Sequence, residues 1–109
     1  MKKIILSAVV IVFVLGMGIS VSAQKKAASK TGETKFNELC AMCHPDGGNI
    51  VNPKKTLHKK DRETNNVRTE ADIIKIMRHP GPGMTMFDEK TVPDDQAKEI
   101  AKYILMTFK

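Results

Sequence analysis

The residues CAMCH, at positions 40–44, place two cysteines and a histidine in one short run. A Cys-x-x-Cys-His run is typical of covalent haem c attachment. Thiols one helical turn apart can each form a thioether with a vinyl group at the same edge of a porphyrin. The histidine that follows is then held against the ring face, where its Nε2 can bind iron. The sequence therefore predicts one haem c attached through Cys40 and Cys43, with His44 as an iron ligand.

Two other uses of these residues stay open at this point. A thioredoxin-like dithiol needs a βαβ context, and the sequence shows no convincing strand pattern. A structural zinc site needs a fourth ligand beside Cys40, Cys43 and His44, and only His58 or His79 could supply an imidazole. Haem attachment needs neither a βαβ context nor a fourth protein ligand, so we take it as the main hypothesis.

A second candidate segment is GPGMTMF, residues 81–87, which carries two methionines in a region rich in glycine and proline. Such a composition predicts a loop rather than a helix face. Glycine lets the backbone approach a ring closely, and proline limits the freedom of the loop. This loop can therefore bring a methionine sulfur close to a haem held at CAMCH. His79, at the end of the preceding helix, is the alternative, although a cation is also favourable at a helix end.

Three segments with helical periodicity must position these groups. Thr31–Cys43 has an apolar stripe that contains Phe36 and Leu39. Thr69–Arg78 begins with Thr69 followed by Asp72, which is a variant of the capping box. Asp94–Phe108 places its apolar residues on one face and two aspartates in its first turn. A short helix is also expected around Leu57–Thr64, so the fold class is all-α, with three or four short helices around the haem.

The first 23 residues have the form of a signal peptide. Lys2 and Lys3 precede an apolar run, and Val21–Ala23 offers small residues for cleavage before Gln24. An uncleaved membrane anchor is the competing interpretation, but the run is short of the roughly 20 apolar residues that a span needs. We therefore expect a signal peptide at 1–23, a disordered leader at 24–30 and a periplasmic domain at 31–109, with no membrane span after cleavage.

Composition and charge limit the class of partner. Of the 18 basic residues, Lys2 and Lys3 belong to the signal, so the mature chain carries about four more basic than acidic residues. This mild charge, with few aromatic residues, does not favour nucleic acid. The densest basic cluster is Lys54–Arg62, which we expect either to be a solvated surface or to dock an acidic redox partner. We expect the chain to be a monomer.

From Thr31 to Phe108 the sequence resembles the class I c-type cytochromes. It is most similar to the small photosynthetic cytochromes of the c-six type and to small monohaem cytochromes of metal-reducing bacteria. The matching blocks are Gly32 and Phe36 before CAMCH, GGNIVNP followed by KTL at 55–57, PGPGM, M-x-x-F at Met84–Phe87, and a last helix with Tyr103.

The resemblance has implications for packing and ligands. It implies that the first and last helices cross at Gly32, with Phe36 near Tyr103, and that the Pro53 carbonyl accepts the Nδ1–H of His44. The family pattern at the second ligand is M-P-x-F, whereas this chain has M-T-M-F. The position three residues before the aromatic implies Met84, with Met86 as the runner-up.

With histidine and methionine both bound, the iron has no open position. The sequence then predicts an exported one-electron carrier between redox proteins, and no enzyme. The alternative is a haem enzyme or gas sensor in which the methionine dissociates, because Thr85 in place of proline leaves the ligand loop less stiff.

Overall fold

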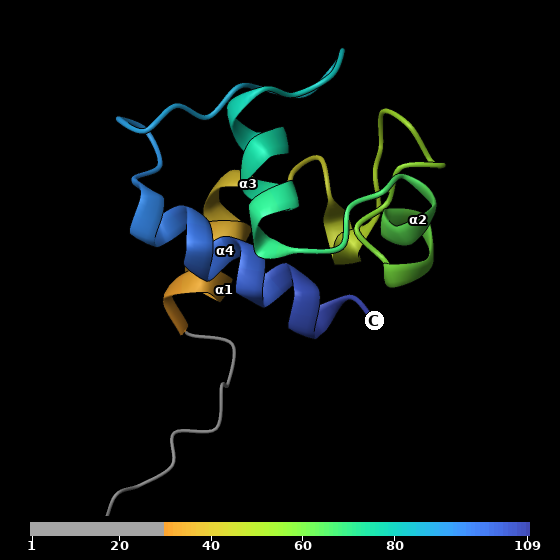
Figure 1. The fold of residues 1–109 in the computed structure, drawn as a ribbon, viewed down its shortest axis with the longest axis horizontal. Helices are drawn as coiled ribbons and strands as arrows, with labels where there is room; N and C mark the ends of the chain where they lie inside the picture. Colours follow the sequence, from red (N-terminus) through yellow and green to blue (C-terminus); the bar gives the residue numbers. More distant parts are fainter. Residues whose placement is uncertain (1–29) are drawn as a thin grey trace, which may run out of the picture.

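The computed structural model describes residues 30–109, which form a small helical domain without strands in that range (Figure 1). Its elements are α1 (Lys30–Leu39), a 3₁₀ turn η1 (Pro45–Gly47), α2 (Lys59–Thr64), α3 (Glu70–Arg78) and α4 (Asp94–Thr107). The all-α prediction is confirmed. The expected signal peptide and leader residues 24–29 lie outside the described residues, and Lys30, expected in the leader, is the first residue of α1. None of the helices formed by residues 30–109 has the length and apolarity to cross a membrane.

Helices α1 and α4 cross at close range and form the base of the fold (Figure 1). Gly32 is buried at the crossing, where a Cβ atom would overlap the backbone carbonyl of Glu99. One turn later, Phe36 packs on Tyr103 with ring centroids 5.2 Å apart. Both features implied by the family resemblance, the glycine crossing and the aromatic pair, are therefore present.

Helix α3 packs on α4 from the other side, and its capping box forms as predicted. The Thr69 hydroxyl accepts a hydrogen bond from the Asp72 amide at 3.1 Å, and the Asp72 carboxylate accepts from the Thr69 amide at 3.0 Å. A third bond, from the Arg68 amide to the same carboxylate, measures 2.9 Å. These bonds satisfy amides that a helix start leaves without intrahelical partners.

The hydrophobic core lies between these three helices and the chain end. Its buried members are Phe36, Ile73, Met77, Val92, Ala97, Ile100, Ala101, Ile104 and Phe108. The sequence predicted all four α4 residues among them, Ala97, Ile100, Ala101 and Ile104, on one face. The core is small, and a large cavity opens beside it.

Helix α1 ends earlier than the sequence periodicity predicted. It stops at Leu39 rather than at Cys43. Beyond it the regular pattern gives way, because the amide of Ala41 donates to Phe36 and that of Cys43 donates to Cys40. The CAMCH residues therefore lie on tight turns instead of on the helix itself.

Candidate functional site

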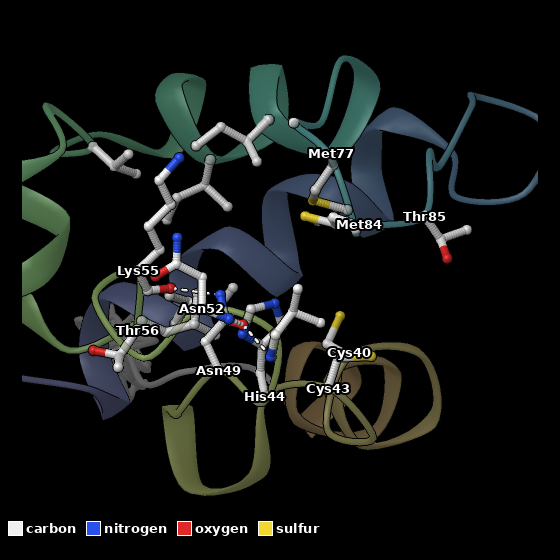
Figure 2. A pocket seen from close by; sticks show the side chains of 18 of the residues that line it. Cys40, Cys43, His44, Asn49, Asn52, Lys55, Thr56, Met77, Met84 and Thr85 are labelled. Carbon is white, nitrogen blue, oxygen red and sulfur yellow. Dashed lines mark hydrogen bonds between the residues drawn. The ribbon is translucent and has the colours of Figure 1, made fainter.

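A cavity of about 550 Å³ lies between α3, α4 and the loops, and it collects most of the residues singled out from the sequence (Figure 2). Cys40, Cys43 and His44 line it from the turns after α1, and Met84 lines it from the loop after α3. Figure 2 shows the cysteines and the methionine sulfur on different sides of the same space. The structure thus brings together residues about 40 positions apart in the chain.

The two cysteines are free thiols in the described structure, one half-buried and one exposed. Burial raises the pKa of the Cys40 thiol to about 11, and the neighbouring Cys43 adds to the rise. Before haem is attached, Cys40 therefore stays protonated at neutral pH. Both thiols face the cavity, which is the arrangement that attachment to one ring edge requires.

The imidazole of His44 is oriented by a backbone carbonyl. Its Nδ1 lies 2.7 Å from the carbonyl oxygen of Gly48. A carbonyl oxygen can only accept, so Nδ1 carries the proton and Nε2 keeps its lone pair. Such a bond fixes the tautomer of a metal-binding histidine and increases its basicity. His44 is therefore prepared to bind a metal through Nε2.

The acceptor differs from the one that the family resemblance implied. The Pro53 carbonyl was expected, and in the structure the Gly48 carbonyl takes this bond instead. The reason lies in the turn: the Gly48 amide donates to Pro45, which brings the Gly48 carbonyl under the imidazole. Pro53 comes only after a further turn, between Asn49 and Asn52, and is exposed.

The segment after CAMCH is fastened as a rigid wall of the cavity. The Asn49 side chain donates to the carbonyl of Lys55 at 2.9 Å and accepts from the amides of Val51 and Asn52 at 3.0 and 2.8 Å. The amide of Leu57 donates to the carbonyl of Gly47 at 2.7 Å. The hydrogen bonds of the Asn49 side chain therefore hold this loop, which has no helix or strand of its own.

The methionine loop forms the opposite wall. The Phe87 amide donates to the carbonyl of Met77 at 2.9 Å, which returns the chain to α3. Gly83 has φ of +88°, and a side chain there would press on Val51, 2.8 Å away. Met84 is half-buried and lines the cavity, whereas Met86 is 61 % exposed and does not line it. The geometry therefore supports Met84 over Met86.

The two remaining histidines lie elsewhere. The ring of His58 packs edge-on against Phe108, with centroids 5.8 Å apart. His79 is exposed at the end of α3. Neither lines the cavity, so the structure does not bring them to Cys40 and Cys43 as a zinc site would require.

The cavity fits the haem that CAMCH predicts. The helices and the residues beside them contribute apolar side chains to the lining: Leu39, Ile73, Ile76, Met77, Ile100 and Ile104. The segment 49–65 contributes six polar side chains beside the apolar Val51 and Leu57: Asn49, Asn52, Lys55, Thr56, Arg62 and Asn65. Figure 2 shows Asn49, Asn52, Lys55 and Thr56 close together. A haem is apolar across its ring and carries two carboxylates at one edge, so the lining offers suitable side chains to both.

One lining residue was misplaced by the sequence analysis. Arg62 was assigned to the exposed basic cluster, but it is only 5 % exposed. In the sequence it stands within the charged run KKDRE, and nothing in that run distinguishes it.

The chain is similar to known cytochromes. Residues 27–104 match the family described as cytochrome c oxidase, cbb3-type, subunit III. Cytochrome c6 of Rippkaea orientalis is 33% identical over 103 residues, covering 94% of this chain and 92% of that protein. Chloroplastic cytochrome c6 of Arabidopsis thaliana is 43% identical over 65 residues, which are 60% of this chain and 37% of that protein.

A solved structure shows the same fold. OmcF, an outer membrane cytochrome of Geobacter sulfurreducens, superposes with a TM-score of 0.70 at 44% sequence identity. The match covers 72% of this chain and 99% of the OmcF chain. The described domain is therefore similar to that protein across nearly its whole length.

Proposed function

Because the chain belongs to the small class I c-type cytochromes and binds one haem c, we propose that it is an exported electron carrier whose iron is held by His44 and Met84. The single observation that carries the proposal is the convergence of Cys40, Cys43, His44 and Met84 on one cavity. The bound haem supplies an iron that takes up and releases one electron. The side chains of this protein attach the haem and hold its iron.

His44 and Met84 act as a pair. His44 presents Nε2 because the Gly48 carbonyl holds the Nδ1 proton. Met84 offers a soft thioether from the opposite wall, which favours ferrous iron and raises the reduction potential. With both positions filled, no site is left for oxygen or peroxide. We therefore propose a carrier rather than an enzyme.

The exposed lysines beside the cavity suit an acidic redox partner. Lys54, Lys55, Lys59 and Lys60 are all exposed, and Lys55 also lines the cavity. We call these four residues the lysine patch. Arg62 is excluded from it by burial. A cationic surface beside the cofactor steers an acidic partner towards the short path for electron transfer.

The absorption spectrum of the oxidised protein tests the ligand assignment. Protein made with the haem-maturation machinery should show the weak far-red band of methionine bound to ferric iron. A spectrum without this band contradicts the role of Met84, while leaving haem attachment intact.

Intact mass of periplasmic material tests export. We expect a chain that begins at Gln24 and carries one haem. A mass that retains Met1–Ala23 contradicts cleavage of the signal.

A further inference from the structure

Arg62 is a buried cation in the wall of the haem cavity, and its surroundings leave its charge uncompensated. Its side chain is 5 % exposed, whereas each member of the lysine patch is exposed to solvent. It stands on α2, the short helix beside the chain end. Buried arginines are nearly always paired with an anion, so the identity of that anion is the question.

The protein itself supplies neutral partners only. Arg62 donates from Nε to the carbonyl of Leu57 at 2.7 Å and from Nη2 to the carbonyl of Phe108 at 3.2 Å. Within residues 30–109, no ion pair joins Arg62 to a carboxylate. Burial lowers the pKa of the guanidinium, and the charge of Glu63 only partly opposes this shift. The two hydrogen bonds fix the side chain without neutralising it.

The cavity that Arg62 lines offers space for the missing anion. Arg62 lines the cavity together with the polar residues of the segment 49–65. Asp61, the nearest acid before it in the chain, is already hydrogen-bonded to the Thr56 hydroxyl. Haem brings carboxylates of its own, and the polar side chains of this segment, Arg62 among them, are the lining groups that can bind them.

We propose that Arg62 is the buried counter-charge of a haem propionate and that its charge raises the reduction potential. A guanidinium matches a carboxylate with two parallel hydrogen bonds, which orient the haem as well as neutralise it. A fixed positive charge in a site shielded from water disfavours the ferric state, because oxidation adds a positive charge nearby. The proposal rests on the haem carrier proposed above.

The reduction potential of three variants tests this role. Arg62→Gln removes the charge but keeps an N–H donor, Arg62→Lys keeps the charge, and Arg68→Gln removes an equal charge from an exposed position. We expect Arg62→Gln to shift the ferrous–ferric equilibrium on the order of tenfold towards ferric, a fall of about 59 mV for one electron. Arg62→Lys should recover most of the shift, and Arg68→Gln should leave the potential near that of the wild type.

A purely structural Arg62 gives a different result. Its loss would then lower the melting temperature through the bonds to Leu57 and Phe108, while the potential stays unchanged. That outcome, or an equal fall in Arg68→Gln, overturns the proposal.

The wild-type protein offers a second measurement if Arg62→Gln does not yield holoprotein. In the ferrous state, nuclear Overhauser contacts should connect the guanidinium protons of Arg62 with the propionate methylenes of the haem. Absence of these contacts refutes the pairing. Failure of the ligand assignment shows separately, as loss of the far-red band in the wild type.

Discussion

Met84 and Met86 are separated by a single threonine, yet their side chains have different surroundings. Met84 is half-buried in the cavity wall, and Met86 is 61 % exposed outside it. The sequence alone left both sulfurs available, because Thr85 replaces the proline of the family pattern. The structure places them differently: the loop bends at Gly83, Met84 then lines the cavity, and Met86 lies in solvent.

Two alanine substitutions separate the sulfurs. Met84→Ala should abolish the far-red methionine band and lower the reduction potential, because the soft ligand is lost. Met86→Ala should keep the band and alter stability by no more than about 0.5 kcal/mol, as is usual for exposed side chains. Spectra and potentials of both holoproteins provide the check. Loss of the band in Met86→Ala alone would transfer the ligand role to Met86.

Single residues also show where sequence analysis reaches its limit. Attachment through CAMCH follows from a local motif, and all three chemical groups of the motif line the cavity. The acceptor of the His44 proton and the burial of Arg62 depend instead on how distant segments meet. Arg62 is held by Phe108, 46 residues away. A charged run in the sequence contains no sign of such a contact.

At the scale of elements, the helices themselves were largely predictable. The spacing of apolar residues in α4 and the capping residues of α3 are local signals, and both helices begin and end within a residue of the expected positions. Helix α1 is shorter than predicted, because the turns of CAMCH break the hydrogen-bond pattern after Leu39. Periodicity in side chains does not reveal such a change in the backbone.

The crossing of α1 and α4 depends on Gly32. Gly32→Ala should destabilise the holoprotein by about 1–3 kcal/mol, since the new Cβ overlaps the Glu99 carbonyl and the helices must separate. Thr34→Ala is the matched control, because Thr34 is an exposed residue of the same helix and does not line the cavity. Denaturant unfolding of both variants measures the difference. Equal stabilities would show that the crossing tolerates a side chain.

The cap of α3 makes stability depend on pH. The amides of Arg68 and Thr69 lower the pKa of Asp72 below its ordinary value. A lowered folded-state pKa gives stability that is present above the unfolded value of about 3.9 and is lost as pH falls through the folded pKa. Thr69→Ala should cost about 1 kcal/mol at neutral pH through loss of the same cap.

Urea unfolding at neutral and acidic pH checks the role of Asp72. Asp72→Asn should lose less stability on acidification than the wild type, while Glu89→Gln, which removes an exposed charge, should retain the wild-type profile. Asp88, whose pKa is also lowered, mainly by the Thr91 amide, keeps part of the dependence in every variant. An unchanged profile in Asp72→Asn would remove the cap from the explanation.

At the scale of the whole molecule, charge and cofactor determine how the protein meets its partners. The lysine patch is exposed to solvent and reaches the cavity at Lys55, which is the patch member that lines it. The sequence identified the cluster, but only the structure separates its exposed lysines from the buried Arg62. Exposed charges attract an oppositely charged partner through solvent, and at 0.1 M salt this attraction is largely screened beyond about 10 Å.

Electron transfer with an acidic redox partner should therefore slow as salt increases. The double variant Lys59→Glu and Lys60→Glu should lower the association rate strongly while the reduction potential changes little. Lys75→Glu with Lys98→Glu makes the same change in net charge on the other side of α3, and we expect a smaller effect. Stopped-flow rates over a salt series measure both. Equal rates for the two double variants would exclude the lysine patch as the docking surface.

Carbon monoxide provides the most direct test of the central claim, that His44 and Met84 close the iron site of an electron carrier. The ferrous wild-type protein should keep its absorption spectrum when incubated with carbon monoxide at neutral pH. Met84→Ala, in which the position opposite His44 is free, should bind the gas and serves as the positive control. Rapid and complete binding by the wild type would contradict the carrier and favour a gas sensor or haem enzyme with a dissociating methionine.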